Sequence, residues 1–289
     1  MEKGGLMVDY GMNGKVALVT GASGGIGRAA ALAFAASGAA VLVSDVNDAG
    51  GAETVAMIEG PGGRASFCNC NVADPAQVKA MVAAAVAAFG RLDYAFNNAG
   101  INNLGADEYQ DDVWARSLAV NLTGVMQCMR EEAEVMLGQG GGAIVNTSSI
   151  NGLTGNGAQP GYVATKHGVV GLTRHGALRW AKAGIRVNAV CPGVIETPMT
   201  APLTADPEMK KLLDGMTPMG RMGRAEEIAS AVVWLCSDQA SFVTGHPLVI
   251  DGGSTAVWAS QSSPPPLRGG LHNRKGAAAT PATAPFFWP

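Results

Sequence analysis

The sequence predicts one α/β domain in which helices cover both faces of a doubly wound, seven-stranded parallel sheet. Short apolar runs that suit buried parallel strands alternate along the chain with segments of helical length. Six runs occupy positions 15–20, 40–44, 92–96, 143–147, 185–190 and 248–250, and Cys68 and Cys70 are expected as small buried thiols on a further strand. Parallel strands joined by helices need right-handed crossovers, which wind the chain to both sides of its first strand. We therefore expect a single Rossmann-type domain over residues 12–258.

Two helices carry clear boundary signals. An Ala-rich segment, 28–36, follows the first strand and its glycines, and Gly38 closes it before the second strand begins. Asp74 is expected to cap a second helix that has Pro75 at its first position and continues to Phe89.

The composition excludes several classes of protein. The 289 residues carry 20 Lys+Arg against 23 Asp+Glu, a formal net charge of −3, so the basic excess that binds phosphate backbones is missing and no nucleic-acid partner is expected. No apolar run reaches the roughly 18 residues that a membrane span needs, and the N-terminus has no secretory signal pattern. Five scattered cysteines suit a reducing compartment and show no zinc-site spacing, so we expect a cytoplasmic protein without a metal.

The last stretch, 259–289, differs in composition. It holds six of the fifteen prolines, three Lys and Arg residues and no acidic residue. This pattern predicts a disordered or loosely docked tail.

A glycine-rich loop, 20–27, separates the first strand from the first helix. Its glycines allow a sharp turn and a close backbone approach to a pyrophosphate, which the N–H groups of the helix would bind. In a Gly-rich protein such a string could be a mere turn, but its place inside a βαβ unit favours a dinucleotide site. The candidate contacts are Gly21, Ser23, Gly25, Ile26 and Gly27.

Asp45 ends the second strand, 18 positions after Gly27. A carboxylate at about this distance accepts hydrogen bonds from the adenosine ribose and repels a 2′-phosphate. Because no Arg or Lys stands at Ser23, Gly24 or Val46, we predict NAD in preference to NADP. The alternative is that Asp45 is a solvated turn residue.

Tyr162 and Lys166 stand four residues apart, so in a helix they share one face. A free phenol has a pKa near 10, and a neighbouring ammonium favours its ionised form, so the pair can serve as a general acid/base for an alcohol and its ketone. The spacing alone is also typical of a solvated helix face. Ser149 follows the strand 143–147 at the rim where ligands bind in such sheets, whereas the alternation of side chains turns Ser148 elsewhere.

Together these motifs resemble those of the short-chain dehydrogenases/reductases, from about Gly14 to Gly253. Residues 20–27 resemble the family's TGxxxGxG loop, residues 97–100 its NNAG motif, and Pro192-Gly193 with Ile195 and Thr197 its nicotinamide-contacting segment. Asn121, Ser149, Tyr162 and Lys166 match the catalytic tetrad. The resemblance also implies cofactor contacts at Asn98, Ala99 and Gly100, and at Asn71 and Val72, where many relatives have Asp in place of Asn71.

The resemblance implies a role for each tetrad residue. Tyr162 would be the general acid/base, Lys166 would assist it and bind the nicotinamide ribose, and Ser149 would orient the substrate oxygen. Asn121 would hold a water in the proton relay. The family also implies a homotetramer or homodimer.

The substrate is predicted from a Met-rich segment between Thr197 and Arg224. Adaptable thioethers favour an apolar or cyclic secondary alcohol over a sugar, although these methionines could simply pack onto the sheet. The candidate residues are Met199, Met209, Met216, Met219 and Met222. Two other functions stay open: an NADPH-dependent 3-oxoacyl carrier protein reductase and a non-catalytic NAD-sensing module.

Overall fold

The computed structural model describes residues 10–102, 109–155 and 159–256, all within one compact unit that ends at Ala256. The predicted tail, 259–289, lies outside the described residues.

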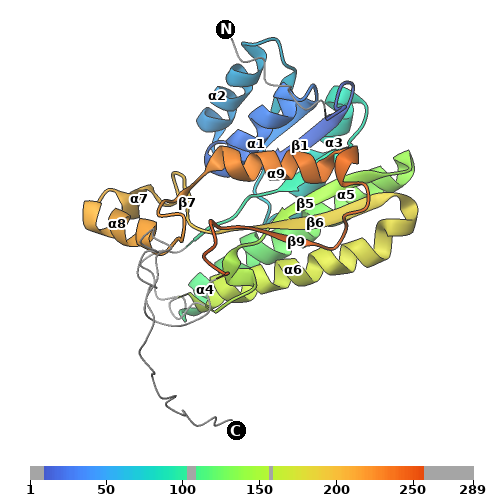
Figure 1. The fold of residues 1–289 in the computed structure, drawn as a ribbon. Coiled ribbons are helices and arrows are strands. Elements are labelled where there is room, and N and C mark those ends of the chain that lie inside the picture. Colours follow the sequence, from blue (N-terminus) through green and yellow to red (C-terminus); the bar gives the residue numbers. More distant parts are fainter. Residues whose placement is uncertain (1–9, 103–108, 156–158, 257–289) are drawn as a thin grey trace, which may run out of the picture. The chain divides into compact units, whose positions relative to one another are not determined.

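Seven parallel strands form the central sheet in the order β3-β2-β1-β4-β5-β6-β9 (Figure 1). The predicted parallel sheet is therefore confirmed, and its winding reverses between β1 and β4. The strands are β1 (Val16–Thr20), β2 (Ala40–Asp45), β3 (Ala65–Asn69), β4 (Tyr94–Asn97), β5 (Gly142–Thr147), β6 (Ile185–Pro192) and β9 (Pro247–Ile250). A separate pair of two-residue strands joins β7 (Ile195–Glu196) to β8 (Gly223–Arg224).

Helices cover both faces of the sheet. In Figure 1 the orange helix α9 (Ala225–Cys236) lies beside the blue helix α1 (Gly25–Ala36) on one face, with α2 (Asp48–Glu59) next to α1. The opposite face is covered by α3 (Pro75–Phe89), α5 (Val125–Gln139) and α6 (Pro160–Trp180). Helix α4 (Asp111–Leu118) packs against α6. Two short helices, α7 (Ala201–Thr204) and α8 (Pro207–Gly215), form a lobe beyond the end of β6.

Each face of the sheet has its own hydrophobic core because side chains alternate along a strand. On β1, Val19 points into the core under α1 and α9, whereas Leu18 points into the core under α3, α5 and α6. Both side chains are fully buried. The nearly continuous apolar sequence of the strand is what this two-sided burial requires.

The helix boundaries follow the sequence signals with one difference. Asp74 caps α3 as predicted, accepting hydrogen bonds from the backbone N–H groups of Ala76 (2.8 Å) and Gln77 (3.3 Å). Helix α1, by contrast, begins at Gly25 and not at position 28, so the last glycines of the loop form its first turn. The glycine loop is therefore shorter than the motif, and its end is helical.

In the described part of the chain, no helix is both long and apolar enough to span a bilayer. The same residues contain no group of three or more His, Cys, Asp or Glu side chains placed to share a metal ion.

Candidate active site

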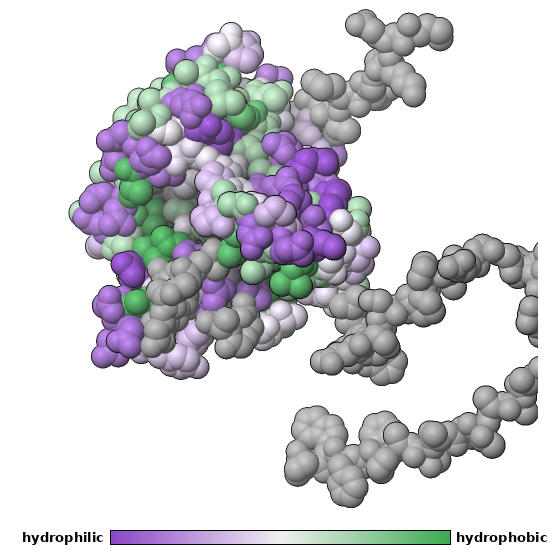
Figure 2. All heavy atoms as spheres, turned by 90° about the vertical axis from the view of Figure 1, so that its left-hand side faces the viewer, coloured by the Kyte–Doolittle hydropathy of each residue, from purple (hydrophilic) through white to green (hydrophobic). Residues whose placement is uncertain are grey.

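A cavity of about 570 Å³ lies at the carboxyl ends of the central strands and extends under the α7–α8 lobe. Figure 2 views the molecule from the side of this lobe, where hydrophobic side chains lie in a recess between hydrophilic ones. Parallel sheets bind ligands at this edge, where the winding reverses. The remaining features of the site follow from the residues that line this cavity.

The glycine loop is held against the end of β4. Nδ2 of Asn98 donates hydrogen bonds of 3.2 Å to the carbonyls of Thr20 and Gly21. A Cβ atom on Gly27 would lie 2.1 Å from the Gly21 carbonyl oxygen, and one on Gly21 would lie 2.8 Å from Cα of Ala99. Only glycine therefore fits at these two positions, because backbone meets backbone there.

The first turn of α1 offers a place for an anion. No side chain caps it and no acidic residue lies in it, while Gly24, Gly25 and Ile26 line the cavity. The leading N–H groups of a helix are donors without intrahelical partners, and the helix dipole favours negative charge beside them. This end of the cavity fits the pyrophosphate of a dinucleotide.

Asp45 lines the same end of the cavity at the carboxyl end of β2, as predicted. One carboxylate oxygen accepts a hydrogen bond of 3.0 Å from the N–H of Ser23, and the other accepts one of 3.0 Å from the N–H of Asn47. These two contacts fix the carboxylate beside the glycine loop, where the adenosine ribose of a dinucleotide would lie.

Tyr162 and Lys166 both line the cavity from α6. The ammonium of Lys166 lies 5.4 Å from the centre of the Tyr162 ring and donates a hydrogen bond of 2.8 Å to the carbonyl of Thr147. The lysine side chain is buried, with 4 % of the residue exposed, and burial lowers its pKa to about 8. A cation at this position favours the ionised form of the phenol.

Ser149 meets this pair from the end of β5, where it lines the cavity. Its Oγ accepts a hydrogen bond of 3.1 Å from the N–H of Asn151, so the hydroxyl hydrogen stays available to another acceptor. The neighbouring Ser148 instead donates to the carbonyl of Lys166 at 2.9 Å, which ties β5 to α6. The two hydroxyls therefore bind different partners, although both serines line the cavity.

Asn121 lies in a π-helical turn, η1 (Ala119–Gly124), and not in a regular α-helix. Its Oδ1 accepts from the N–H of Ile101 at 2.8 Å, and its Nδ2 donates to the carbonyl of Ile101 at 2.9 Å. The side chain therefore anchors the segment that follows β4. π-Bulges are frequent at functional sites because they displace the regular backbone hydrogen bonds.

The predicted cofactor residues fall into two groups. Those that line the cavity are Gly21, Ser23, Gly25, Ile26, Asp45, Asn98, Gly100, Tyr162, Lys166, Pro192, Gly193, Ile195 and Thr197. The predicted cofactor residues Gly27, Asn71, Val72 and Ala99 are not part of that lining, and neither is Asn121 of the predicted catalytic tetrad. Two of these, Gly27 and Ala99, are the close backbone contacts described above, and Val72 packs against Gly124 of η1.

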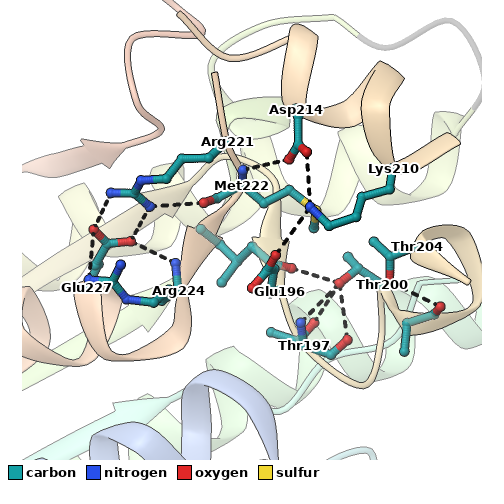
Figure 3. A network of polar contacts seen from close by, with 12 residues as sticks. Glu196, Thr197, Thr200, Thr204, Lys210, Asp214, Arg221, Met222, Arg224 and Glu227 are labelled. Atoms are coloured by element: carbon teal, nitrogen blue, oxygen red, sulfur yellow. Dashed lines mark hydrogen bonds and ion pairs between the residues drawn. The ribbon is translucent and has the colours of Figure 1, made fainter. Parts of the chain in front are cut away.

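The lobe over the cavity is fastened by polar contacts (Figure 3). Lys210 of α8 lies between Glu196 (3.6 Å) and Asp214 (3.0 Å). Arg221 pairs with Glu227 at 2.7 Å, and this arginine together with the N–H of Arg224 lowers the pKa of Glu227 to about 2. The first cluster joins α8 to β7, and the second joins the segment that follows α8 to β8 and α9.

Sequence reasoning missed most of the outer lining of the cavity. Only Met199 of the five predicted methionines lines it, while Met222 is buried in the protein. The expectation of a methionine-rich lining was therefore wrong, because the other thioethers lie outside the cavity wall. Branched aliphatic side chains and amides take that place: Ile101, Asn102, Ile150, Asn151, Gln159, Val194, Leu203 and Leu213. These residues come from six separate segments and share no motif.

Comparisons with known proteins match this arrangement. A family model described as enoyl-(acyl carrier protein) reductase matches residues 21–255. The cyclohexanol dehydrogenase of Acinetobacter sp. (strain SE19) is 48% identical over 84% of this chain and 96% of its own length. A 2,5-dichloro-2,5-cyclohexadiene-1,4-diol dehydrogenase of Sphingobium indicum is 44% identical over 85% and 99%.

A solved structure agrees as well. The gluconate 5-dehydrogenase of Burkholderia cenocepacia, in complex with NADP and tartrate, superposes with a TM-score of 0.81 at 33% identity, covering 86% of this chain and 98% of its own.

This chain belongs to the short-chain dehydrogenase/reductase family. It is an oxidoreductase that transfers hydride between a secondary alcohol and a nicotinamide cofactor, giving a ketone.

Proposed function

We propose that the protein is an NAD-dependent dehydrogenase of cyclic secondary alcohols, with Tyr162 as its general acid/base. The proposal rests on one observation: Ser149, Tyr162 and Lys166 line the same cavity, and the outer wall of that cavity is largely aliphatic. A binding module without catalysis has no need of a phenol beside a buried ammonium.

The proposed mechanism assigns one step to each polar group. A bound nicotinamide, which Pro192, Gly193, Ile195 and Thr197 would hold, would supply the acceptor for the hydride of the carbinol carbon. Ser149 donates a hydrogen bond to the substrate oxygen and orients it toward the phenol. Tyr162, ionised under the influence of Lys166, takes the hydroxyl proton as the carbonyl forms. In the direction of reduction the same phenol returns the proton.

Asn121 supports this chemistry from outside the cavity lining. Because both polar atoms of its side chain bind the backbone of Ile101, we assign it the positioning of that segment. The relay water that the resemblance implies would then be held by main-chain atoms of the π-helical turn.

NAD is the proposed cofactor because Asp45 presents a fixed carboxylate beside the glycine loop. A 2′-phosphate would meet this negative charge, and Val46, the residue that follows, supplies no cation. The family includes NADP-binding members, such as the gluconate 5-dehydrogenase described above. The proposal therefore depends on the charge at Asp45 and not on family membership.

The proposed substrate is a ring alcohol of modest polarity. Leu203 and Leu213 of the lobe line the cavity together with Val194, and these aliphatic side chains favour a hydrocarbon ring. The two curated relatives described above are named for cyclohexanol and for a cyclohexadiene diol. Among the described residues that line the cavity, Lys166 supplies the positive charge, and it already acts on Tyr162. An anionic sugar acid would have no other cation of this lining to bind, so such substrates are disfavoured.

A cofactor and substrate panel tests the proposal. Oxidation of cyclohexanol, cyclohexane-1,4-diol and gluconate should be followed with NAD and with NADP, at 340 nm where the reduced cofactor absorbs. We expect turnover of the ring alcohols with NAD. Turnover confined to gluconate, or a strong preference for NADP, would contradict the substrate or the cofactor assignment respectively.

We further propose a homotetramer or homodimer in the cytoplasm. The edge strand β9 and the exposed side chains of Leu178 and Phe242 would suit an interface between copies of the chain. All five cysteines are free thiols, which suits a reducing compartment. Sedimentation analysis that returned a monomer would contradict the assembly.

A further inference from the structure

Glu132 is a buried acid that lies next to β4, one of the central strands whose carboxyl ends meet at the cavity. Glu132 of α5 is fully buried, and its Oε2 accepts a hydrogen bond of 3.0 Å from Nδ2 of Asn97, the last residue of β4. The salt bridges formed by the described residues do not include Glu132. An ionised carboxylate here would be a buried charge without a counter-ion, which is strongly unfavourable.

The acid begins a chain of buried hydrogen bonds that crosses the sheet. Asn97 also donates to Oδ1 of Asn146 at 3.1 Å, and Asn146 donates to Oγ1 of Thr173 at 3.0 Å. Asn97 and Asn146 stand side by side in the register of β4 and β5, and Thr173 belongs to α6. The chain therefore connects α5, β4, β5 and α6, which include the elements that carry Ser149, Tyr162 and Lys166.

Within this network of buried hydrogen bonds, two oxygen atoms have no hydrogen-bond partner, and both belong to the pair formed by Glu132 and Asn97. They are Oε1 of Glu132 and Oδ1 of Asn97. If the carboxyl group were ionised, both atoms would be buried acceptors without a donor, which is costly. One proton on Oε1 makes that atom a donor and gives the Asn97 oxygen a partner. The acid and the amide would then form a ring with two hydrogen bonds, the first of which is the bond from Nδ2 of Asn97 to Oε2 of Glu132.

We propose that Glu132 is a positioning residue that keeps its proton in the native protein and donates a hydrogen bond to Asn97. The residues that directly follow the two bridged asparagines hold the site together. Asn98 binds the glycine loop, and the carbonyl of Thr147 accepts the hydrogen bond of Lys166. The neutral acid thus fixes the ends of β4 and β5, on which the cofactor loop and the catalytic lysine depend.

The surroundings of Glu132 favour the neutral form. Burial raises its pKa to about 8, although the hydrogen bond from Asn97 acts in the opposite direction. Helix α6 and strand β5 contribute Thr173 and Asn146 to this hydrogen-bond network, and neither side chain titrates. The side chains that α3 contributes to this core are apolar. The titratable neighbour on α5 is Cys128, and burial holds the pKa of this thiol well above its ordinary value.

Infrared spectroscopy of the complete protein tests the proton directly. At pH 7 the wild type should show the carbonyl stretch of a protonated carboxyl group, and this band should disappear in Glu132→Gln. Glu134→Gln is the matched control, because Glu134 is exposed on the same helix, and it should leave the band unchanged. A wild-type spectrum without the band, or a band that survives in Glu132→Gln, would overturn the proposal.

The pH dependence of stability gives a second test with a defined sign. A carboxyl group whose pKa is raised in the folded state binds more protons there than in the unfolded state, so stability falls as the pH rises from the unfolded pKa through about 8. The melting temperature of wild type should therefore fall over this range relative to that of Glu132→Gln, whose amide donates to Asn97 at every pH. Parallel curves for the two proteins would contradict the proposal.

A third comparison separates positioning from general stability. Glu132→Gln should keep kcat and the cofactor Kd within about threefold of wild type, because it preserves both hydrogen bonds. Glu132→Met, of similar volume but without a donor, should weaken cofactor binding by roughly tenfold, since it leaves Asn97 unsatisfied. If the Met variant folds and binds cofactor as well as the Gln variant does, the acid has no positioning role. The infrared and melting experiments need no substrate, so their outcome is independent of the proposed function.

Discussion

The ammonium of Lys166 lies one helical turn from Tyr162, 5.4 Å from the centre of its ring, while it donates to the carbonyl of Thr147. This relationship joins α6 to the end of β5 and sets the charge beside the phenol. The cation is buried, so its influence on the phenol is weakly screened by solvent. The first two predictions concern this pair.

Tyr162→Phe should lower kcat by at least ~10²-fold while leaving cofactor affinity nearly unchanged, because it removes the group that transfers the proton. Initial-rate kinetics with a ring alcohol and fluorescence titration with NADH measure the two quantities. Tyr10→Phe is the matched control, since Tyr10 packs against the core under α1 and does not line the cavity. Equal activity of the two variants would contradict the assignment of Tyr162.

Replacing Lys166 by methionine should change how stability depends on pH. Burial lowers the pKa of Lys166 to about 8, so the unfolded chain binds more protons between about 8 and 10.5 and the folded state gains stability as the pH rises through this window. The gain is lost as the pH falls to the folded pKa, and at its full extent it is about 3 kcal/mol. Urea unfolding at pH 7.5 and pH 10 should show a larger increase for wild type than for Lys166→Met.

Asp45→Asn combined with Val46→Arg should shift cofactor preference from NAD toward NADP by roughly 100-fold in kcat/KM. The change removes the carboxylate that a 2′-phosphate would meet and adds a cation at Val46, which is 62 % exposed. Asn can still accept one of the two backbone hydrogen bonds that hold Asp45, so the loop should stay in place. A wild type that already uses both cofactors equally well would defeat this prediction.

Gly27→Ala should abolish measurable cofactor binding, because its Cβ would lie 2.1 Å from the carbonyl oxygen of Gly21. The backbone at positions 21 and 27 cannot move apart without opening the loop. Gly138→Ala on α5 provides the control, since nothing lies within 4 Å of the added atom there. We expect this control to bind cofactor normally and to be stabilised by up to ~1 kcal/mol through helix propensity. Calorimetric titration with NADH distinguishes the two.

Lys210→Met should raise KM for the ring alcohol by a few fold and change kcat less, because this lysine links the lobe helix α8 to Glu196, which stands between Ile195 and Thr197 of the cavity lining. The aliphatic stem is kept and only the charge is lost. The measurement is steady-state kinetics at low and high salt. The wild-type KM should move toward that of the variant at high salt, since these partly exposed pairs are screened. A KM that is insensitive to both changes would contradict a role for this contact.

Much of the fold could be predicted because each signal involves residues that lie close together in the sequence. The strand at 16–20 needs two-sided burial and is therefore apolar throughout, and Asp74 caps α3 through atoms two and three residues away. The glycine loop, Asp45 and the Tyr162–Lys166 spacing could also be found, since each lies within one βαβ unit or one helical turn. The Met-rich segment predicted the wrong lining because composition does not say which side chains face a cavity.

The amino-acid sequence by itself determined the alternation of strands and helices, the cofactor loop, and the residue types required for proton transfer. Tertiary structure alone decided which aliphatic side chains form the outer wall and how Asn121 is bound to Ile101. It also decided that Glu132 meets Asn97 across 35 positions of sequence, at a buried place that no salt bridge among the described residues reaches. The physical reason is that burial and partner choice depend on contacts between distant segments, and these contacts exist only after the sheet has assembled.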